Sequence, residues 1–224
     1  MNSRAKPIRR NPIPVKFRLV SLMMIALLAS CRGSEMEDGG VYITRTACPL
    51  VGVPAGTGDI TLFDPPNSKA ATAIDVTATM TNVFGNCSDI NADRILSNVS
   101  FDVVAVRREA GPARQVVLPY FDVLVQGGSR VVAKRVGRIA LNFEAGSLRA
   151  QTRGQAVIRV SRAAATLPEN ARLALTQRRK AGTDIAAVDP MTDPAVREAV
   201  ARATFEHLVG FQMSQEQLRY NVTR

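Results

Sequence analysis

The sequence has few of the residues that enzymes use for catalysis. It contains one histidine, His207, three cysteines and no tryptophan in 224 residues. It has no glycine-flanked serine nucleophile, no phosphate-binding loop and no pair of metal-binding histidines. A lone histidine on a helix is more often a surface or packing residue than a base, and we expect this role for His207 on the last long helix. The sequence therefore predicts no catalytic residue and favours a protein that is not an enzyme.

Acidic residues are missing from the start of the chain. None precedes Glu35, whereas six basic residues precede the first cysteine, namely Arg4, Lys6, Arg9, Arg10, Lys16 and Arg18. The apolar run that follows, 19–30, has twelve residues, and a helix that spans a bilayer needs about 20. A basic segment, a short apolar run and small residues at its end are typical of a secretory signal peptide. We therefore expect residues 1–30 to be a signal peptide.

The apolar run ends in Leu28-Ala29-Ser30-Cys31. This stretch resembles the lipobox of bacterial lipoproteins, in which an aliphatic residue and two small residues precede a cysteine. The resemblance implies cleavage between Ser30 and Cys31 and a covalent lipid on the Cys31 thiol, the only bound group that we expect. It also implies a place in the bacterial cell envelope. The alternative is an ordinary signal peptide with a chance cysteine at its end.

The segment after the cysteine is short and polar. Residues 31–40 end in two glycines, which is typical of a flexible tether. Arg32 occupies the position where an aspartate favours retention in the inner membrane of enteric bacteria. By that resemblance the protein is anchored in the outer membrane and faces the periplasm.

The charge of the chain is concentrated in the leader. The net charge is +10, and removing the six leader charges leaves 23 basic and 19 acidic residues, or +4. A basic balance indicates nucleic-acid binding only when the basic residues belong to the fold, so we expect no nucleic-acid partner. The expected partners are the membrane, through the lipid, and an unknown envelope protein or glycan. The cluster 178–180 is either a solvated helix end or a contact with acidic headgroups or an acidic partner.

Two cysteines remain after Cys31 is assigned to lipid. Cys48 and Cys87 form an even pair in an oxidising compartment, which favours a disulfide. Such a bond stabilises the fold by roughly 3–4 kcal/mol when it closes a loop of this length. The alternative is two buried free thiols. Two distant thiols and one histidine are too few ligands for zinc, so we expect no metal there.

Alternation of apolar and polar residues predicts strands after the tether. The clearest case is 74–81, with apolar residues at every second position, which buries one face of a strand. Further strands are expected at 42–48, 59–63, 99–107, 115–125, 129–143 and 149–160. Short strands joined by turns predict a mainly β fold, an antiparallel β-sandwich over 41–165 that is immunoglobulin-like or related, with a barrel as second choice. The absence of tryptophan argues against a true antibody-type domain.

Helical signals dominate residues 166–224, which we expect to form a helical C-terminal extension. One helix is predicted over 167–180, from a proline to a basic end before Gly182. A second begins at Asp193-Pro194 and ends at Gly210, with a buried face of Val196, Val200, Ala203 and Leu208. Ser214 and Gln217 are spaced as a capping box for a last short helix.

Two classes of function remain. The first is a non-catalytic binding or scaffolding lipoprotein of the envelope. The second is a carbohydrate-active enzyme or other hydrolase whose two carboxylates face each other about 5–10 Å apart in a cleft. A weaker possibility is an exposed sheet edge that accepts a partner strand. Asp89, Asn91 and Asp93 resemble the opening of a calcium loop, but Arg94 replaces the turn glycine, so no metal site is predicted.

Overall fold

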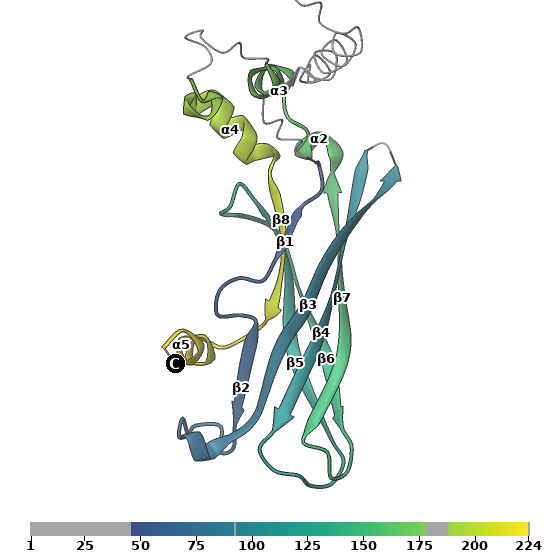
Figure 1. Ribbon diagram of the computed structural model, residues 1–224, viewed down its shortest axis with the longest axis vertical. Coiled ribbons are helices and arrows are strands. Elements are labelled where there is room, and N and C mark those ends of the chain that lie inside the picture. The colour runs from purple at the N-terminus through teal and green to yellow at the C-terminus, as the bar shows by residue number, and fades with distance from the viewer. Residues whose placement is uncertain (1–45, 92, 178–187, 224) are drawn as a thin grey trace, which may run out of the picture. The chain divides into compact units, whose positions relative to one another are not determined.

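The computed structural model describes residues 46–91, 93–177 and 188–223. The lipobox residues and the basic cluster 178–180 lie outside these ranges. Tyr42–Arg224 is one of two units into which the chain divides. It is mainly β, with two four-stranded sheets, so the mainly β class that the sequence predicts is confirmed (Figure 1).

The first sheet combines strands from both ends of the unit. Its order is β1-β8-β5-β6. These strands are β1 (Leu50–Gly52), β8 (Phe205–Phe211), β5 (Arg114–Gln126) and β6 (Arg130–Phe143). β1 runs parallel to β8, whereas β5 is antiparallel to both β8 and β6. β6 is therefore the last strand at one edge.

The second sheet is antiparallel throughout, in the order β2-β3-β4-β7. Its strands are β2 (Asp59–Phe63), β3 (Ile74–Asn91), β4 (Arg94–Arg107) and β7 (Arg149–Ser161). β7 is the last strand at one edge. The chain passes from the second sheet to the first between β4 and β5, and returns between β6 and β7.

The main core is built from side chains of both sheets. Inward residues alternate along the strands, as in β7, where every second residue from 154 to 160 is buried. This period of two buries one face of each strand. The largest fully buried apolar side chains are Phe101, Phe143, Phe211, Ile60, Leu118 and Leu141.

Most strands lie where the alternating pattern predicts them. β2 has the predicted bounds, and β5, β6 and β7 differ from the predicted segments by one residue at one or both ends. β3 and β4 contain the predicted segments but are longer, because β3 continues to Asn91 and β4 begins at Arg94. The strand predicted at 42–48 is wrong in its described part, because β1 begins only at Leu50. Residues 46–48 are held instead by the disulfide between Cys48 and Cys87, whose Cα atoms lie 6.0 Å apart.

The C-terminal region is not the helical extension that the sequence predicts. The helix predicted from Asp193 to Gly210 spans only Pro194–Ala203, and Phe205–Phe211 form β8 in the middle of the first sheet. His207 and Leu208 therefore lie on a strand and not on a helix. Phe205, His207, Val209 and Phe211 are buried at a spacing of two. Pairing with β5 over seven residues outweighs the weaker helical spacing.

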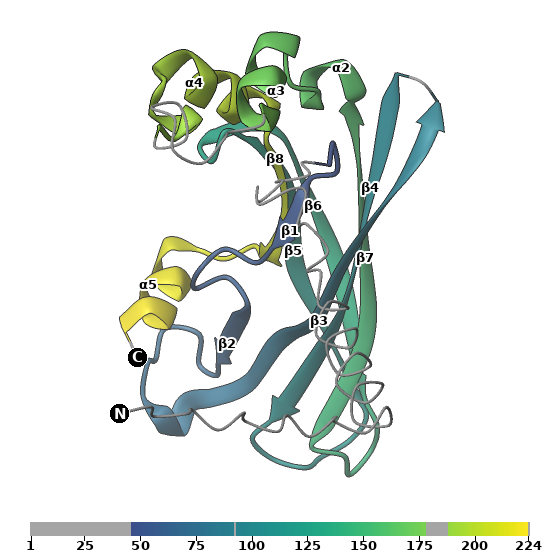
Figure 2. The same cartoon turned by 45° about the horizontal axis from the view of Figure 1, so that its top comes forward.

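Helices lie at two places along the sheets (Figure 2). α2 (Arg162–Ala165), α3 (Glu169–Thr176) and α4 (Pro194–Ala203) follow β7 and precede β8, and a short 3-10 turn, Pro190–Thr192, comes just before α4. A second 3-10 turn, Ala71–Ala73, lies between β2 and β3. α4 is capped by Asp193, whose side chain accepts a hydrogen bond from the Ala195 amide, and it buries Val196 and Val200 as predicted. No described helix is long and apolar enough to cross a membrane.

The last helix, α5 (Gln215–Thr223), begins with the predicted capping box. The Ser214 amide donates to Gln217 Oε1, and the Gln217 amide donates to Ser214 Oγ. The Asn221 side-chain amide donates to the carbonyl oxygens of Gly56 and Asp59. α5 is thereby attached beside β2 (Figure 2).

Candidate binding surface

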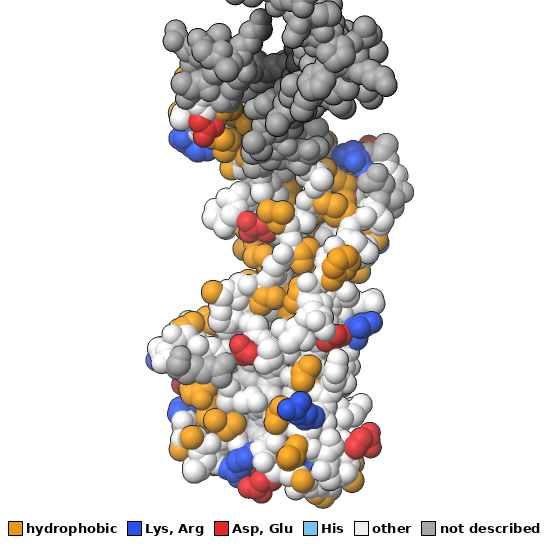
Figure 3. Space-filling model, viewed as in Figure 1, with side chains coloured by type: hydrophobic (Ala, Val, Ile, Leu, Met, Phe, Trp, Pro, Cys, Tyr) orange, Lys and Arg blue, Asp and Glu red, His pale blue; other side chains and the backbone are white. Residues whose placement is uncertain are grey.

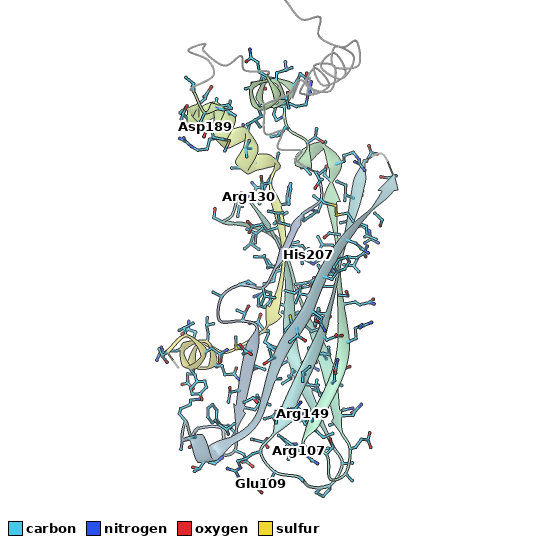
Figure 4. The ribbon with its side chains drawn as sticks, in the orientation of Figure 1. Arg107, Glu109, Arg130, Arg149, Asp189 and His207 are labelled. Carbon is cyan, nitrogen blue, oxygen red and sulfur yellow. A yellow bond between two sulfur atoms is a disulfide. The ribbon has the colours of Figure 1, made fainter. Side chains whose placement is uncertain are left out.

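The single histidine lies in a buried polar cluster between the two sheets. His207 on β8 is fully buried, and its Nδ1 lies 3.0 Å from Ser97 Oγ on β4, which is also fully buried. Its Nε2 lies 3.9 Å from Asp122 Oδ2 on β5. The Arg135 guanidinium on β6 donates to the same carboxylate oxygen at 2.6 Å. The cluster thus joins strands of both sheets, and Figure 4 labels His207, its central residue.

Serine, histidine and aspartate in contact invite comparison with a hydrolase triad. In a triad the base contacts the nucleophile through one ring nitrogen and the carboxylate hydrogen-bonds the other. Here the second contact is too long for a hydrogen bond, and Ser97 has no exposed surface. Arg135 also donates to the Val157 carbonyl oxygen on β7. This geometry favours a role in joining the sheets.

Burial also sets the charge of the histidine. It lowers the pKa of His207 to about 4, although the Asp122 carboxylate acts in the opposite direction. His207 is therefore neutral at physiological pH. A buried histidine that must stay neutral makes the fold sensitive to acid.

We expect His207 to make stability fall as the pH decreases from about 6.5 to 4. In this window the unfolded chain binds a proton that the folded chain does not. A pKa shift of this size corresponds to about 3 kcal/mol. Chemical unfolding of the parent and of His207→Gln, repeated across this window, should show the stability advantage of the parent shrinking by about that amount. A difference that stays constant with pH would contradict this assignment.

Arginines bind two carboxylates of the second sheet, the buried Asp102 and the half-buried Asp75. Asp102 on β4 accepts hydrogen bonds from Asn82 Nδ2 at 2.8 Å and Arg153 Nε at 3.0 Å, and these bonds lower the pKa of Asp102. Arg114 lowers the pKa of Asp75 in the same way. A general acid in a glycosidase needs the opposite shift. No observation on these carboxylates therefore favours the hydrolase.

The residues that resemble a calcium loop close the hairpin between β3 and β4. Asn91 Oδ1 accepts hydrogen bonds from the Asp93 and Arg94 amides, which is the pattern of an Asx turn. Nothing is described of the Asp89 side chain. Among the described residues, no three acidic, histidine or cysteine side chains are grouped to hold a metal. A cavity of about 640 Å³ near this turn is lined by Asp93 and by residues of α2 and its flanks.

Basic side chains line the two edge strands that meet at one flank of the sheets. β6 carries four basic residues and β7 carries three, and neither strand contains an acidic residue. All seven are exposed; they are Arg130, Lys134, Arg135, Arg138, Arg149, Arg153 and Arg159. We call this set the basic flank. Figure 4 shows Arg130 at the turn between β5 and β6 and Arg149 at the start of β7, toward the other end of the strands.

The basic flank is not fully neutralised by acidic partners. Arg135 pairs with Asp122, and Arg153 pairs with Asp102. No acidic group among the described residues forms an ion pair with Arg130, Lys134, Arg138 or Arg159. Positive charge along an exposed edge attracts anionic partners and lowers the risk of pairing with another sheet edge.

Apolar side chains are also exposed along β6. Val131, Val132 and Val136 are 60%, 46% and 58% exposed. Residues 130–136 are exposed on both faces of the strand. No local sequence pattern indicates this flank, because its residues are distributed over two strands and only the sheet order brings the strands to one side.

No protein family, curated protein or solved structure matches the chain.

Proposed function

We propose that the protein is a lipid-anchored envelope lipoprotein whose β unit binds an anionic component of the envelope, without catalysis of its own. The observation that carries the proposal is the basic flank, in which two neighbouring edge strands carry seven basic residues and no acidic residue. The chain beyond the leader has a net charge of only +4. Charge concentrated on one flank creates a local field that attracts anions.

The anchor is proposed from the sequence. Leu28-Ala29-Ser30-Cys31 follows a basic and apolar leader, as in bacterial lipoproteins. A tether of ten residues, 31–40, reaches at most about 35 Å when fully extended. The β unit would then work close to the membrane surface, where it meets other envelope components. The absence of an aspartate after Cys31 supports the outer membrane, on its periplasmic side.

Replacing Cys31 by alanine tests the anchor. We expect Cys31→Ala to remain an uncleaved, unlipidated precursor, because both processing steps need the thiol-bearing residue. The parent should enter the detergent phase in a phase-partition assay and incorporate labelled fatty acid. The variant should incorporate none, whereas Ser34→Ala should behave as the parent. Fatty-acid incorporation by the Cys31 variant would contradict lipidation.

Charge reversal on the basic flank tests the binding function. The probe is alginate, an anionic polymer, added to the full lipidated protein in non-ionic detergent at low salt. We expect Arg130→Glu, Arg138→Glu and Arg159→Glu together to weaken binding at least about tenfold, and added salt to weaken parental binding. The matched control reverses Arg172, Arg197 and Arg219, which are exposed on helices. Equal loss in both triple variants would show that only net charge matters.

Within the mainly β class, we also propose that the fold is an immunoglobulin-like or related sandwich. In that fold strands B and E are neighbours in one sheet, and strands C and F are neighbours in the other. β4 lies beside β7 and β5 lies beside β8, which supports the assignment of these four strands as B, E, C and F. The departure is β1, which takes the place beside β8 but runs parallel to it.

A further inference from the structure

The outer face of the second sheet has an exposed aromatic residue in a polar surrounding. Phe84 on β3 is 65% exposed. A bulge explains its position, because Thr81 pairs with Asp102 and the next pair is Phe84 with Ser100. One extra residue in a strand turns the following side chains to the other face. Without the bulge, Phe84 would point into the core.

The register places polar side chains around this ring. Asn86 pairs with Asn98 across β3 and β4, and Ser100 pairs with Gln155 across β4 and β7. Neighbouring strands lie about 5 Å apart, and alternate residues along a strand about 7 Å apart. Phe84 therefore lies close to Asn86, Asn98 and Gln155. Each of them is no farther from it than the width of one or two sugar rings.

Two arginines of the basic flank border the same face. On β7, Arg153 lies two residues before Gln155, and Arg159 lies four residues after it, beyond Val157. Arg153 uses its Nε to bind Asp102, while its side chain remains 72% exposed. Figure 3 shows one face of the molecule, on which hydrophobic, charged and other side chains are interspersed.

Each group on this face matches a part of an acidic sugar. An aromatic ring packs against the apolar face of a pyranose ring, and it loses little conformational freedom on binding. Asparagine and glutamine amides donate to and accept from hydroxyl groups. Guanidinium groups bind carboxylates with two parallel hydrogen bonds. The face thus combines contacts for the ring, the hydroxyls and the carboxylate of a uronic acid.

This surface fits an acidic sugar better than it fits a lipid bilayer or a protein partner. A membrane-inserting surface needs several large apolar side chains together, and the core of a protein interface is largely depleted of charge and polar groups. Around Phe84, the nearest exposed apolar side chain in the register is Val157, which is 36% exposed. The remaining neighbours are amides, hydroxyls, arginines and the Asp102 carboxylate, which is 6% exposed and accepts hydrogen bonds from Asn82 and Arg153.

We propose that this face, formed by Phe84, Asn86, Asn98, Gln155, Arg153 and Arg159, binds an acidic glycan. The inference rests on the proposed function, since it names the anionic component and places it next to the basic flank. Arg159 belongs to both surfaces, so the glycan chain would continue from the face onto the flank.

The test is the binding of a uronate oligosaccharide by the full lipidated protein in non-ionic detergent. We expect Phe84→Ala to weaken binding about tenfold, the effect of losing one aromatic contact and its buried area. Phe84→Tyr should restore it. Leu173→Ala, at an exposed apolar side chain on α3 outside both surfaces, is the matched control and should bind as the parent.

Each outcome separates the glycan site from the broader function. If the triple reversal on the flank abolishes binding and Phe84→Ala does not change it, the glycan site is wrong and the anionic function stands. If the parent binds neither the oligosaccharide nor alginate, the proposed function fails with it. If phosphatidylglycerol added to the micelles displaces the oligosaccharide from the parent, the face binds lipid headgroups and the glycan assignment is wrong.

Discussion

Replacing Gly154 by valine is expected to lower the free energy of unfolding by about 3 kcal/mol or more, the cost of overpacking a closed core. A Cβ atom on Gly154 would lie 2.3 Å from Cε2 and Cζ of Phe101, its cross-strand partner. Phe101 is buried and packs edge to face on Tyr120, with ring centroids 5.3 Å apart. Tyr120 in turn covers Gly137, its own partner on β6.

Two aromatic rings therefore cover two glycines at the edges of the sheets. Each glycine allows the ring of the neighbouring strand to lie across its own strand. The Tyr120 hydroxyl also donates to the Gln155 carbonyl oxygen on β7 at 3.1 Å. A side chain at position 154 or 137 would move a ring and separate the edge strands that form the basic flank.

Thermal unfolding of the full protein in non-ionic detergent measures this effect. A loss of about 3 kcal/mol corresponds to a melting temperature lower by roughly 6–12 °C in a protein of this size. Gln151→Val, at an exposed position on the same strand, should change stability by no more than about 0.5 kcal/mol. Equal melting temperatures for Gly154→Val and the parent would show that Phe101 does not occupy this place.

Arg107→Ala is the second substitution with a large expected effect, a loss of about 3–4 kcal/mol. Arg107 is 4% exposed at the end of β4. Its guanidinium donates to the carbonyl oxygens of Ser147, Pro112, Gly111 and Glu144 at 2.6 to 3.2 Å. Its charged centre also lies 5.3 Å above the Phe143 ring. Hydrogen bonds from a charged donor contribute about 1.5–3 kcal/mol each before loop relaxation and water offset the loss.

The reason for this effect is the place of Arg107 between two connections. It fastens the turn between β4 and β5 to the turn between β6 and β7 (Figure 4), and both turns cross from one sheet to the other. Arg107→Lys should recover only part of the loss, because an ammonium group cannot reproduce the planar fork. Arg108→Ala, which removes an exposed pair with Glu109, should be close to neutral. Equal stability of all three variants would contradict this account.

The sequence predicts most of the sheets because their strands alternate strictly. β7 and the first half of β3 bury alternate residues. This alternation can be read in the sequence whichever element packs against the strand. The capping box at Ser214 and Gln217 is equally local, since its bonds join residues three apart. The cysteine pair follows from counting, because two remain once Cys31 is assigned.

β8 was mispredicted because its identity depends on distant residues. Val196, Val200 and Leu208 fit a helical stripe, but Leu208 belongs to a strand that pairs with residues 120–126. The bulge that exposes Phe84 has no sequence signal of its own apart from Asn82, which has a positive φ of 50°. The basic flank depends on sheet order, which no local pattern contains. Tertiary pairing, not local preference, therefore positions the candidate surface.

Photo-crosslinking in intact envelopes tests the central claim most directly. A photoreactive residue replaces Arg138 on the basic flank of the full lipidated protein, and in a second protein it replaces Leu218 on α5. We predict an anionic adduct from position 138 that disappears when Arg130 and Arg159 are reversed to glutamate, and no such adduct from position 218. The same adducts from both positions, or an adduct at 138 that survives the reversals, would contradict binding through the basic flank.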